Sequence, residues 1–304
     1  MEEFFENYVA GFGLEPGLAS VLTDLVAVFP KVAEALKTSQ LGYAGSENSY
    51  GERQLKLDVY TNQLFQDALL KNVHVSSIAS EELPEEIKGK GGADGYSVAF
   101  DPLDGSSLVD VNLAVGSIFG IYKGDGFIGR KGSEQVAALI VVYGPRLTFM
   151  ITHGKGVFEY LYKDLVGKFA GNGAVKLDSG KKYFAPGNLR VSASEAWYVK
   201  LMEHWMKNEY TLRYSGGMVP DVNHLLKKGG GIFTYPGSKE KPEGKLRLLY
   251  ECAPMAFLME QAGGAASDQA GARILDLEVQ KLDQRTPIFL GATNEVELVQ
   301  KFMS

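Results

Sequence analysis

The stretch Ala99-Phe-Asp-Pro-Leu-Asp-Gly-Ser-Ser107 decides how we interpret the rest of the chain. Pro102 fixes its own φ and biases Asp101 toward extended geometry, so we expect a strand to end here and a turn to begin. Gly105 and the two serines after it are then expected to open a helix, where free backbone N–H groups favour a phosphate. Asp101 and Asp104 would repel a phosphate, so the stretch predicts a divalent cation such as Mg²⁺ between them and the anion. An Asp-rich surface turn is the alternative that the stretch alone leaves open.

Apolar runs on both sides of this stretch predict a sheet. We expect strands over residues 73–79, 96–100 and 117–122, followed by a meander over 136–142, 147–152 and 156–160.

One loop between these strands contains a motif that also occurs in dinucleotide-binding proteins. Gly124-Asp-Gly-Phe-Ile-Gly129 has the G-x-G-x-x-G spacing of dinucleotide-binding loops. We reject that function because no Asp or Glu occurs from Gln135 to Phe158 to hold a ribose hydroxyl. The segment is predicted to be a glycine-rich hairpin connection.

The N-terminal part is predicted to be helical. Residues 18–36 carry an apolar stripe at helical spacing that is broken at Pro30, and a second helix is expected from Glu52 onward. On that second helix Asp58 and Asn62 lie one turn apart. Residues 41–51 between the helices are polar and glycine-rich, so we expect a loop.

The C-terminal part is expected to form a separate unit. Residues 177–188 lack clear periodicity, so we place the boundary there and predict domains over residues 1–186 and 187–304. Beyond it we expect a helix over 193–208 and strands over 231–235 and 245–250. Lys245 and Arg247 would share a face of the last strand and could grip one phosphate, although such a pair is more often a wetted strand face.

Three further carboxylates are placed where they could join Asp101 and Asp104. Glu81 and Glu82 follow the predicted strand 73–79, and at a strand end both could approach one metal cluster. On their own they are more often a solvated charge pair. Glu251 lies between a predicted strand and a helix that begins near Pro254, a junction at which α/β proteins bind ligands.

Composition excludes several classes of protein. The 304 residues are 45% hydrophobic, which suits one large or two medium domains with ample core. The net charge of -6 suggests neither a nucleic-acid partner nor an anionic membrane. Cys252 is the only cysteine, which excludes an internal disulfide or a cysteine-rich zinc site and fits a reducing compartment. We therefore expect a cytoplasmic protein, with a plastid as the alternative if a targeting segment has been removed.

Motifs along the whole chain point to one family. They are, in chain order, Ser80-Glu-Glu82, Phe100-Asp-Pro-Leu-Asp-Gly-Ser-Ser107, Arg213-Tyr214, Met218-Val-Pro-Asp-Val222, Lys245-Leu-Arg-Leu-Leu-Tyr-Glu-Cys252 and Gln284-Arg-Thr-Pro-Ile288. Together they resemble the fructose-1,6-bisphosphatase and sedoheptulose-1,7-bisphosphatase family. Asp-Pro-Leu-Asp-Gly alone would indicate only the wider superfamily of metal-dependent sugar and inositol phosphatases.

The resemblance also favours one branch of that family. Tyr143-Gly-Pro-Arg-Leu-Thr-Phe149, Phe184-Ala-Pro-Gly-Asn-Leu-Arg190 and the run from Tyr210 to Asn223 are similar to the sedoheptulose enzymes of plant plastids. A seven-carbon substrate is therefore expected, with a fructose-preferring or dual-specificity enzyme as the alternative. A sugar-phosphate-binding protein without catalysis is the remote alternative.

The resemblance implies both a fold and a reaction. The fold would be α/β, an α+β layered sandwich of the sugar phosphatase type, with two mixed-sheet domains and helices layered between and around them. The reaction would be hydrolysis of the 1-phosphate of sedoheptulose 1,7-bisphosphate, giving sedoheptulose 7-phosphate and phosphate, by a phosphoric monoester hydrolase. Two or three Mg²⁺ ions per active site are implied, with Mn²⁺ as a substitute, and so is a homo-oligomer, dimer or tetramer.

Carried over by position, the family's functional residues fall on three groups of side chains. The implied metal ligands are Glu81, Glu82, Asp101, the Leu103 carbonyl, Asp104 and Glu251. Asp58 beside Glu82 would take the proton from water, and Glu52 falls where the family has an acidic residue on a mobile loop. The implied substrate-binding residues are Gly105, Ser106 and Ser107 for the leaving phosphate, Asn188, Arg213, Tyr214, Tyr235 and Lys245 for the distal phosphate, and Met218, Lys245 and Arg247 for the sugar. Arg213 is expected to reach a neighbouring subunit's active site.

Two departures from relatives concern regulation. Plastid relatives carry a cysteine pair in the loop that corresponds to residues 41–54, and this chain has none there, so no disulfide switch is expected. The AMP-binding fructose enzymes carry a Thr-Gly-Glu-hydrophobic-Thr run where this chain has Gly13-Leu-Glu-Pro-Gly-Leu-Ala19. We therefore expect no potent inhibition by AMP.

Overall fold

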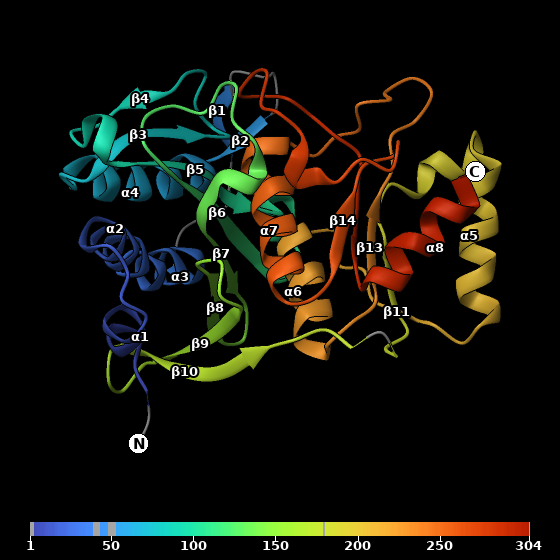
Figure 1. Ribbon diagram of the computed structural model, residues 1–304, viewed down its shortest axis with the longest axis horizontal. Helices are drawn as coiled ribbons and strands as arrows, with labels where there is room; N and C mark the ends of the chain where they lie inside the picture. Colours follow the sequence, from blue (N-terminus) through green and yellow to red (C-terminus); the bar gives the residue numbers. More distant parts are fainter. Residues whose placement is uncertain (1–2, 39–42, 48–52, 179, 304) are drawn as a thin grey trace.

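The computed structural model describes residues 3–38, 43–47, 53–178 and 180–303. Two β-sheets are separated and covered by helices (Figure 1). Helices α1–α4 cover one face of the larger sheet, α6 and α7 fill the space between the sheets, and α5 and α8 cover the outer face of the smaller sheet. This layering confirms the predicted α/β fold with two mixed sheets and helices between and around them.

The larger sheet has eight strands in the order β10-β9-β8-β7-β6-β5-β3-β4. Only the β3–β5 pair is parallel, and all the others are antiparallel. The strands are β3 (Val75–Ser80), β4 (Ile87–Lys88), β5 (Tyr96–Asp104), β6 (Val115–Lys123), β7 (Gln135–Tyr143), β8 (Leu147–Thr152), β9 (Val157–Lys163) and β10 (Lys168–Val175). The predicted meander is confirmed, and β10 is an addition that two glycines hide from a pattern of apolar residues.

The smaller sheet has five strands in the order β12-β11-β13-β15-β14. The strands are β11 (Tyr183–Pro186), β12 (Thr211–Leu212), β13 (Ile232–Tyr235), β14 (Ala265–Ser267) and β15 (Ile288–Gly291). β11 runs parallel to both β12 and β13. The division at residue 186 stays a prediction, but because β11 belongs to the second sheet, a division between β10 and β11 is favoured.

The helices predicted from apolar stripes are present with shifted ends, and α1, α6 and α8 are additions. They are α1 (Phe5–Gly11), α2 (Pro16–Val26), α3 (Phe29–Thr38), α4 (Lys56–Lys71), α5 (Ala196–Lys207), α6 (Met218–Lys228), α7 (Ala253–Gln261) and α8 (Thr293–Met303). The stripe of residues 18–36 is divided between α2 and α3, with Pro30 in the first turn of α3. No helix among the described residues combines the length and the apolar character needed to span a bilayer.

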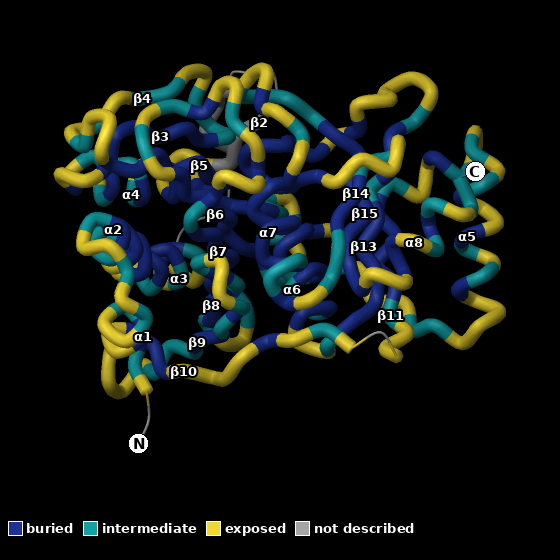
Figure 2. The backbone as a smooth tube through the Cα atoms, in the orientation of Figure 1, coloured by how far each residue is buried: buried dark blue, intermediate teal, exposed yellow. Residues whose placement is uncertain are grey.

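Both faces of the larger sheet are buried. Along β7, Ala138 and Ile140 face the helices between the sheets, whereas Leu139 and Val141 face the N-terminal helices. Figure 2 shows the buried residues concentrated in the central strands and in α7, with exposed residues at the periphery. Strand β5, which carries Asp101 and Asp104, therefore lies in the middle of the protein, held on both faces.

Three local expectations are wrong. Residues 43–47 form strand β1 and pair with β2 (Arg53–Leu55), where a loop and then the start of a helix were expected. Residues 245–250 do not form a strand: Arg247 makes one isolated bridge, and Leu248–Cys252 form a π-helical turn that leads into α7. The apolar run Leu248-Leu249-Tyr250 is compatible with a buried strand or a buried helix, and periodicity cannot distinguish them.

The third wrong expectation concerns the stretch Ala99–Ser107. β5 does not end at Asp101 but continues through Pro102 to Asp104. Ser106–Leu108 then form a single 3-10 turn, which is too short to act as the expected helix N-terminus.

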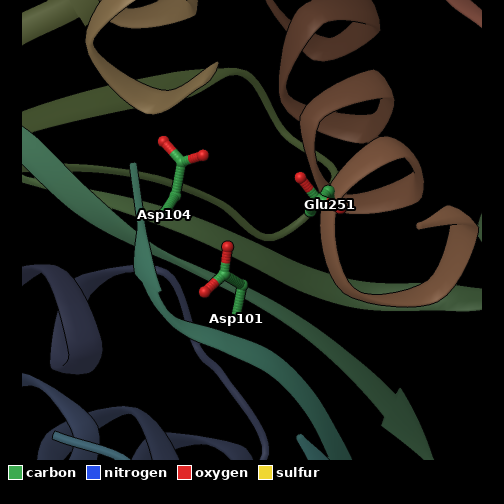
Figure 3. A group of neighbouring side chains, drawn as sticks. All are labelled: Asp101, Asp104 and Glu251. Atoms are coloured by element: carbon green, nitrogen blue, oxygen red, sulfur yellow. The ribbon is translucent and has the colours of Figure 1, made fainter. Parts of the chain in front are cut away.

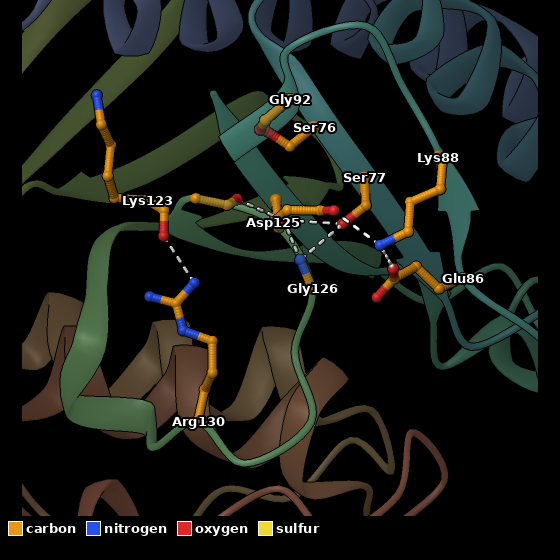
Figure 4. Close-up of polar contacts among 11 residues, drawn as sticks. Ser76, Ser77, Glu86, Lys88, Gly92, Lys123, Asp125, Gly126 and Arg130 are labelled. Atoms are coloured by element: carbon orange, nitrogen blue, oxygen red, sulfur yellow. Dashed lines mark hydrogen bonds and ion pairs between the residues drawn. The ribbon is translucent and has the colours of Figure 1, made fainter. Parts of the chain in front are cut away.

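The glycine-rich segment between β6 and β7 is a hairpin connection, as predicted. Gly124, Gly126 and Gly129 all have φ between 81° and 89°, which side chains disfavour. The Gly126 N–H lies 3.0 Å from Ser97 Oγ and 3.3 Å from Ser77 Oγ, and Lys88 pairs with Asp125 of the same loop (Figure 4). The Gly126 N–H therefore donates to serine hydroxyls of the protein itself, which is consistent with a structural loop.

Candidate active site

A β-bulge in β5 brings Asp101 and Asp104 to the same place. Asp101 pairs with Ile118 of β6, and Asp104 pairs with Gly116. The two aspartates are three residues apart on β5, whereas their partners are two residues apart on β6, so β5 has one extra residue here. In a regular strand, residues three apart point to opposite faces, and the extra residue in the bulge reverses that. Pro102 suits the position because a bulged residue need not donate to the ladder.

Glu251 joins the two aspartates from a different part of the chain. It lies in the π-helical turn Leu248–Cys252, and its Oε2 accepts a hydrogen bond from the Arg247 backbone N–H at 2.6 Å. Figure 3 shows the three carboxylates converging, and ligand oxygens of all three lie within 4.8 Å of one another. Asp101, Asp104 and Glu251 are 5%, 7% and 5% exposed.

These carboxylates are placed where negative charge is costly. Burial, followed by the charges of Glu81, Asp104 and Glu251, raises the pKa of Asp101 well above its usual value. Burial also raises the pKa of Asp104 to about 7 and that of Glu251 to about 8. A bound cation would remove this penalty, because it stabilises the charged form of each group.

Backbone N–H groups fix the orientation of Asp104. Its Oδ2 accepts from Val219 at 2.7 Å and its Oδ1 from Met218 at 3.2 Å, at the start of α6. Gly116, opposite Asp104, permits this approach, because a Cβ there would lie 2.3 Å from Val219 Cγ1. The helix from the C-terminal part of the chain is thereby attached to the carboxylate of β5.

These groups line a cavity of about 460 Å³ that contains most of the predicted site residues. Its predicted lining residues are Asp58, Glu81, Glu82, Asp101, Leu103, Asp104, Gly105, Ser106, Ser107, Tyr214, Met218, Tyr235, Lys245, Arg247 and Glu251. Glu52 lies outside the described residues. Asn188 and Arg213 are described but do not line this cavity.

Arg247 occupies a different place from the one expected. Its side chain is 2% exposed, and its guanidinium forms an ion pair with Glu81, whose side chain is 14% exposed. Lys245 is exposed, so the two cations do not share a strand face as predicted. Arg247 therefore contacts the acidic end of the cavity and neutralises part of its charge.

Asn188 and Arg213 make contacts elsewhere. Asn188 has a φ of 51°, and its Nδ2 donates to the Pro236 carbonyl at 2.8 Å. Arg213 is exposed, and its Nη1 donates to the Leu212 carbonyl at 2.8 Å. Tyr214, next to Arg213, does line the cavity, and burial raises its pKa to about 12, so its hydroxyl stays protonated.

The cavity wall also contains four residues that are not predicted from the sequence: Gly216, Gly217, Phe233 and Leu246. The two glycines precede α6, and Asp221 in its first turn accepts the N–H groups of Ser215 at 2.8 Å and Gly216 at 3.4 Å. Glycines followed by a first-turn Asp are a helix-start signal that could have located this loop.

Three buried carboxylates that face a polar cavity are a donor set that suits a divalent cation. The sequence matches "Fructose-1-6-bisphosphatase, N-terminal domain" over residues 7–172 and "Fructose-1-6-bisphosphatase, C-terminal domain" over residues 177–304. The chain therefore belongs to the fructose-1,6-bisphosphatase family, whose members are sugar bisphosphatases, and it is an enzyme of the phosphoric monoester hydrolase class.

Relatives of both substrate types resemble the chain over nearly all of its length. It is 44% identical to fructose-1,6-bisphosphatase class 1 of Geobacter sulfurreducens, over 95% of this chain and 92% of that protein. It is 42% identical to the chloroplastic sedoheptulose-1,7-bisphosphatase of Spinacia oleracea, over 96% and 78%. The holo form of Leishmania major fructose-1,6-bisphosphatase superimposes with a TM-score of 0.92 at 31% identity, over 99% of both chains.

Proposed function

We propose that this enzyme hydrolyses the 1-phosphate of sedoheptulose 1,7-bisphosphate, giving sedoheptulose 7-phosphate and phosphate. The observation that carries a metal-dependent phosphatase site is the convergence of three buried carboxylates in one wall of a polar cavity. The seven-carbon preference depends on stretches such as Tyr143–Phe149 that resemble the plastid enzymes. Fructose 1,6-bisphosphate is the second candidate substrate, favoured by the identity to the bacterial class 1 enzymes.

The donor set fits a divalent cation. Carboxylate and carbonyl oxygens are the ligands of Mg²⁺ and Mn²⁺, and the pKa values of these carboxylates are raised in the absence of a cation. Two or three ions would be held by Glu81, Glu82, Asp101, Asp104, Glu251 and the Leu103 carbonyl. When bound, such ions neutralise phosphate oxygens and lower the pKa of water.

Other residues of the cavity are proposed for proton transfer and for binding the phosphate that leaves. Asp58, 4% exposed, would accept the proton of the attacking water together with Glu82. Gly105, Ser106 and Ser107 would hold the phosphate that leaves. Glu52 remains a proposed acidic residue outside the described part of the chain.

Binding of the rest of the substrate is proposed for the other end of the cavity. Tyr214, Tyr235 and Lys245 would hold the distal phosphate, and Met218, Lys245 and Arg247 the sugar. The distal phosphate would supply binding energy that orients the reacting one. Asn188 and Arg213 are further proposed contacts.

An assembly of several copies is part of the proposal. Arg213 is exposed and lies outside its own chain's cavity, which supports its proposed role at a neighbouring subunit's site in a dimer or tetramer. The proposed compartment is the cytoplasm, with a plastid as the alternative raised by the plant relative.

Phosphate release from each sugar bisphosphate, with Mg²⁺ and with a chelator, tests the proposal. The expected result is Mg²⁺-dependent release with a higher kcat/KM for the seven-carbon substrate. A higher kcat/KM for fructose 1,6-bisphosphate would establish the second candidate instead. Binding of both sugars without any phosphate release would overturn catalysis altogether.

A further inference from the structure

A hydroxyl pair lies directly behind the β5 bulge. Ser117 of β6 pairs with Val141 of β7, between the two β6 residues that flank the bulge, and its Oγ donates to the Pro102 carbonyl at 2.7 Å. The Tyr143 hydroxyl, at the end of β7, lies 2.9 Å from the same Oγ. Ser117 is fully buried and Tyr143 is 6% exposed, so water does not compete for these contacts.

The Pro102 carbonyl determines which group donates in each of these hydrogen bonds. A carbonyl can only accept, so the single Ser117 hydroxyl proton is used on Pro102. The Tyr143 O–H must then be the donor to Ser117 Oγ. Burial raises the pKa of Tyr143, so its proton stays in place over the working pH range.

The carbonyl that Ser117 holds is part of the peptide plane that orients Asp101. The Pro102 C=O and the Leu103 N–H belong to one planar unit. At the other end of that unit the Leu103 N–H donates to Asp101 Oδ1 at 2.9 Å. The plane is therefore held by a hydroxyl on one side and engages the carboxylate on the other.

Pro102 makes this support more important. It has no N–H, so its carbonyl is its only backbone hydrogen-bonding group, and the Ser117 hydroxyl donates to that carbonyl. Outer hydrogen bonds that orient metal-binding carboxylates typically affect metal affinity strongly.

We propose that Ser117 and Tyr143 are positioning residues of the carboxylate cluster: the chain from the Tyr143 hydroxyl through Ser117 to the Pro102 carbonyl holds the bulge so that Asp101 and Leu103 are preorganised for a divalent cation. This inference deepens the proposed function and depends on its metal site. Neither residue lines the cavity, so neither contacts substrate.

Direct binding of Mn²⁺ to the purified full-length protein, followed by calorimetry or by the electron paramagnetic resonance of the free ion, tests the proposal. Ser117→Ala is expected to weaken binding roughly 10-fold or more, since outer-ligand changes cost 10- to 100-fold. Tyr143→Phe should weaken it less, because Ser117 can still donate. Ser117→Thr keeps the donor and should bind like the wild type.

Tyr122→Phe is the matched control. Tyr122 is also a buried tyrosine, it lies on β6 with Ser117, and its hydroxyl has no hydrogen-bond partner among the described residues. This variant should bind Mn²⁺ like the wild type, and its KM for substrate should also be unchanged.

The outcomes distinguish failure of the proposed metal site from failure of the positioning role of Ser117 and Tyr143. If the wild type binds no divalent cation, the proposed metal site fails and the inference fails with it. If the wild type binds Mn²⁺ and Ser117→Ala binds it equally well, only the inference is overturned. Equal weakening in Tyr122→Phe and Ser117→Ala would also overturn it, because any lost buried hydroxyl would then have the same effect.

Discussion

The acidic end of the cavity and its distal end are built in different ways. Asp101, Asp104 and Glu251 lie on a central strand and a buried helical turn, are 5–7% exposed, and each accepts a backbone N–H. At the distal end, Lys245 is exposed and Tyr214 is 42% exposed, both on segments between regular elements. The end proposed for chemistry is thus fixed by one chain, whereas the end proposed for substrate selection keeps its side chains accessible.

The difference indicates what each end has to do. Preorganised groups stabilise a transition state without rearrangement, so the groups near the reacting phosphate benefit from being fixed. Exposed cations on connecting segments can instead adjust to a sugar of one length or another. Replacing residues at the two ends should therefore have effects of different size and on different kinetic constants.

The largest effect is expected at the acidic end. Asp101→Asn removes one carboxylate charge without changing side-chain size, and should lower kcat by more than about 1,000-fold. Because burial of the charged carboxylate is unfavourable, the free energy of unfolding of the metal-free protein should not fall. Rates of phosphate release and chemical denaturation measure the two effects.

The matched control for this substitution is Asp125→Asn. Asp125 is an exposed aspartate in the β6–β7 loop, paired with Lys88, and its replacement should leave kcat unchanged. Appreciable activity of Asp101→Asn under saturating Mg²⁺ would remove Asp101 from the proposed metal ligands.

A smaller effect, confined to KM, is expected at the distal end. If Arg213 reaches the distal phosphate of a neighbouring site, Arg213→Ala removes one charged hydrogen-bonding group and should raise KM roughly 10-fold or more with little change in kcat. Steady-state kinetics with a bisphosphate substrate measure both constants. Arg146→Ala, at an exposed arginine between β7 and β8, provides the control for loss of one positive charge. An unchanged KM would remove Arg213 from the distal site.

The two ends also differed in how far the sequence could predict them. The predicted strand ahead of Asp101, the hairpin after β6 and the carboxylates that meet at the cavity from separate segments all depend on short runs whose residue types restrict the backbone. The bulge was not predictable, because Pro102 is equally compatible with a strand end and with an unpaired position inside a strand. Which of these occurs depends on the pairing with β6, where Asp101 lies opposite Ile118 and Asp104 opposite Gly116.

The segment that carries Lys245 of the distal end and Arg247 of the acidic end was harder to predict for a different reason. Lys245-Leu-Arg247 alternates like a strand, but Arg247 pairs with Glu81, which is 166 positions away in the sequence. Such a contact exists only after both parts of the chain have folded. Local pattern therefore predicted the wrong geometry for residues 245–250, although Lys245 and Arg247 both line the cavity.

The buried carboxylates at the acidic end should also make the free energy of unfolding depend on pH. Burial raises the pKa of Asp104 to about 7 and that of Glu251 to about 8 in the metal-free folded protein, whereas carboxyl groups of the unfolded chain have pKa values near 4. Between these values the folded state binds more protons, so the free energy of unfolding of the metal-free protein should fall as pH rises.

Thermal unfolding with a chelator and with saturating Mg²⁺ tests this dependence. The stabilisation by Mg²⁺ should be larger at about pH 8 than at about pH 6, since a cation competes with protons for the carboxylates. Asp101→Asn should reduce the stabilisation at both pH values. A stabilisation independent of pH would show that these carboxylates are not protonated in the metal-free protein.

The smallest effect is expected for Asn188, and it distinguishes a binding residue from a structural one at the distal end. Asn188 is a proposed contact of the distal phosphate, but its Nδ2 already donates to the Pro236 carbonyl and it does not line the cavity. We therefore expect Asn188→Ala to change KM by less than about 3-fold while lowering the free energy of unfolding by about 1–2 kcal/mol, because a hydrogen bond is lost and alanine must adopt a φ of 51°. Asn188→Gly accepts that φ, so it should be more stable than Asn188→Ala with the same KM. A rise in KM as large as that of Arg213→Ala in both variants would instead place the Asn188 amide on the phosphate, and the distal site would then extend beyond the cavity that this chain forms alone.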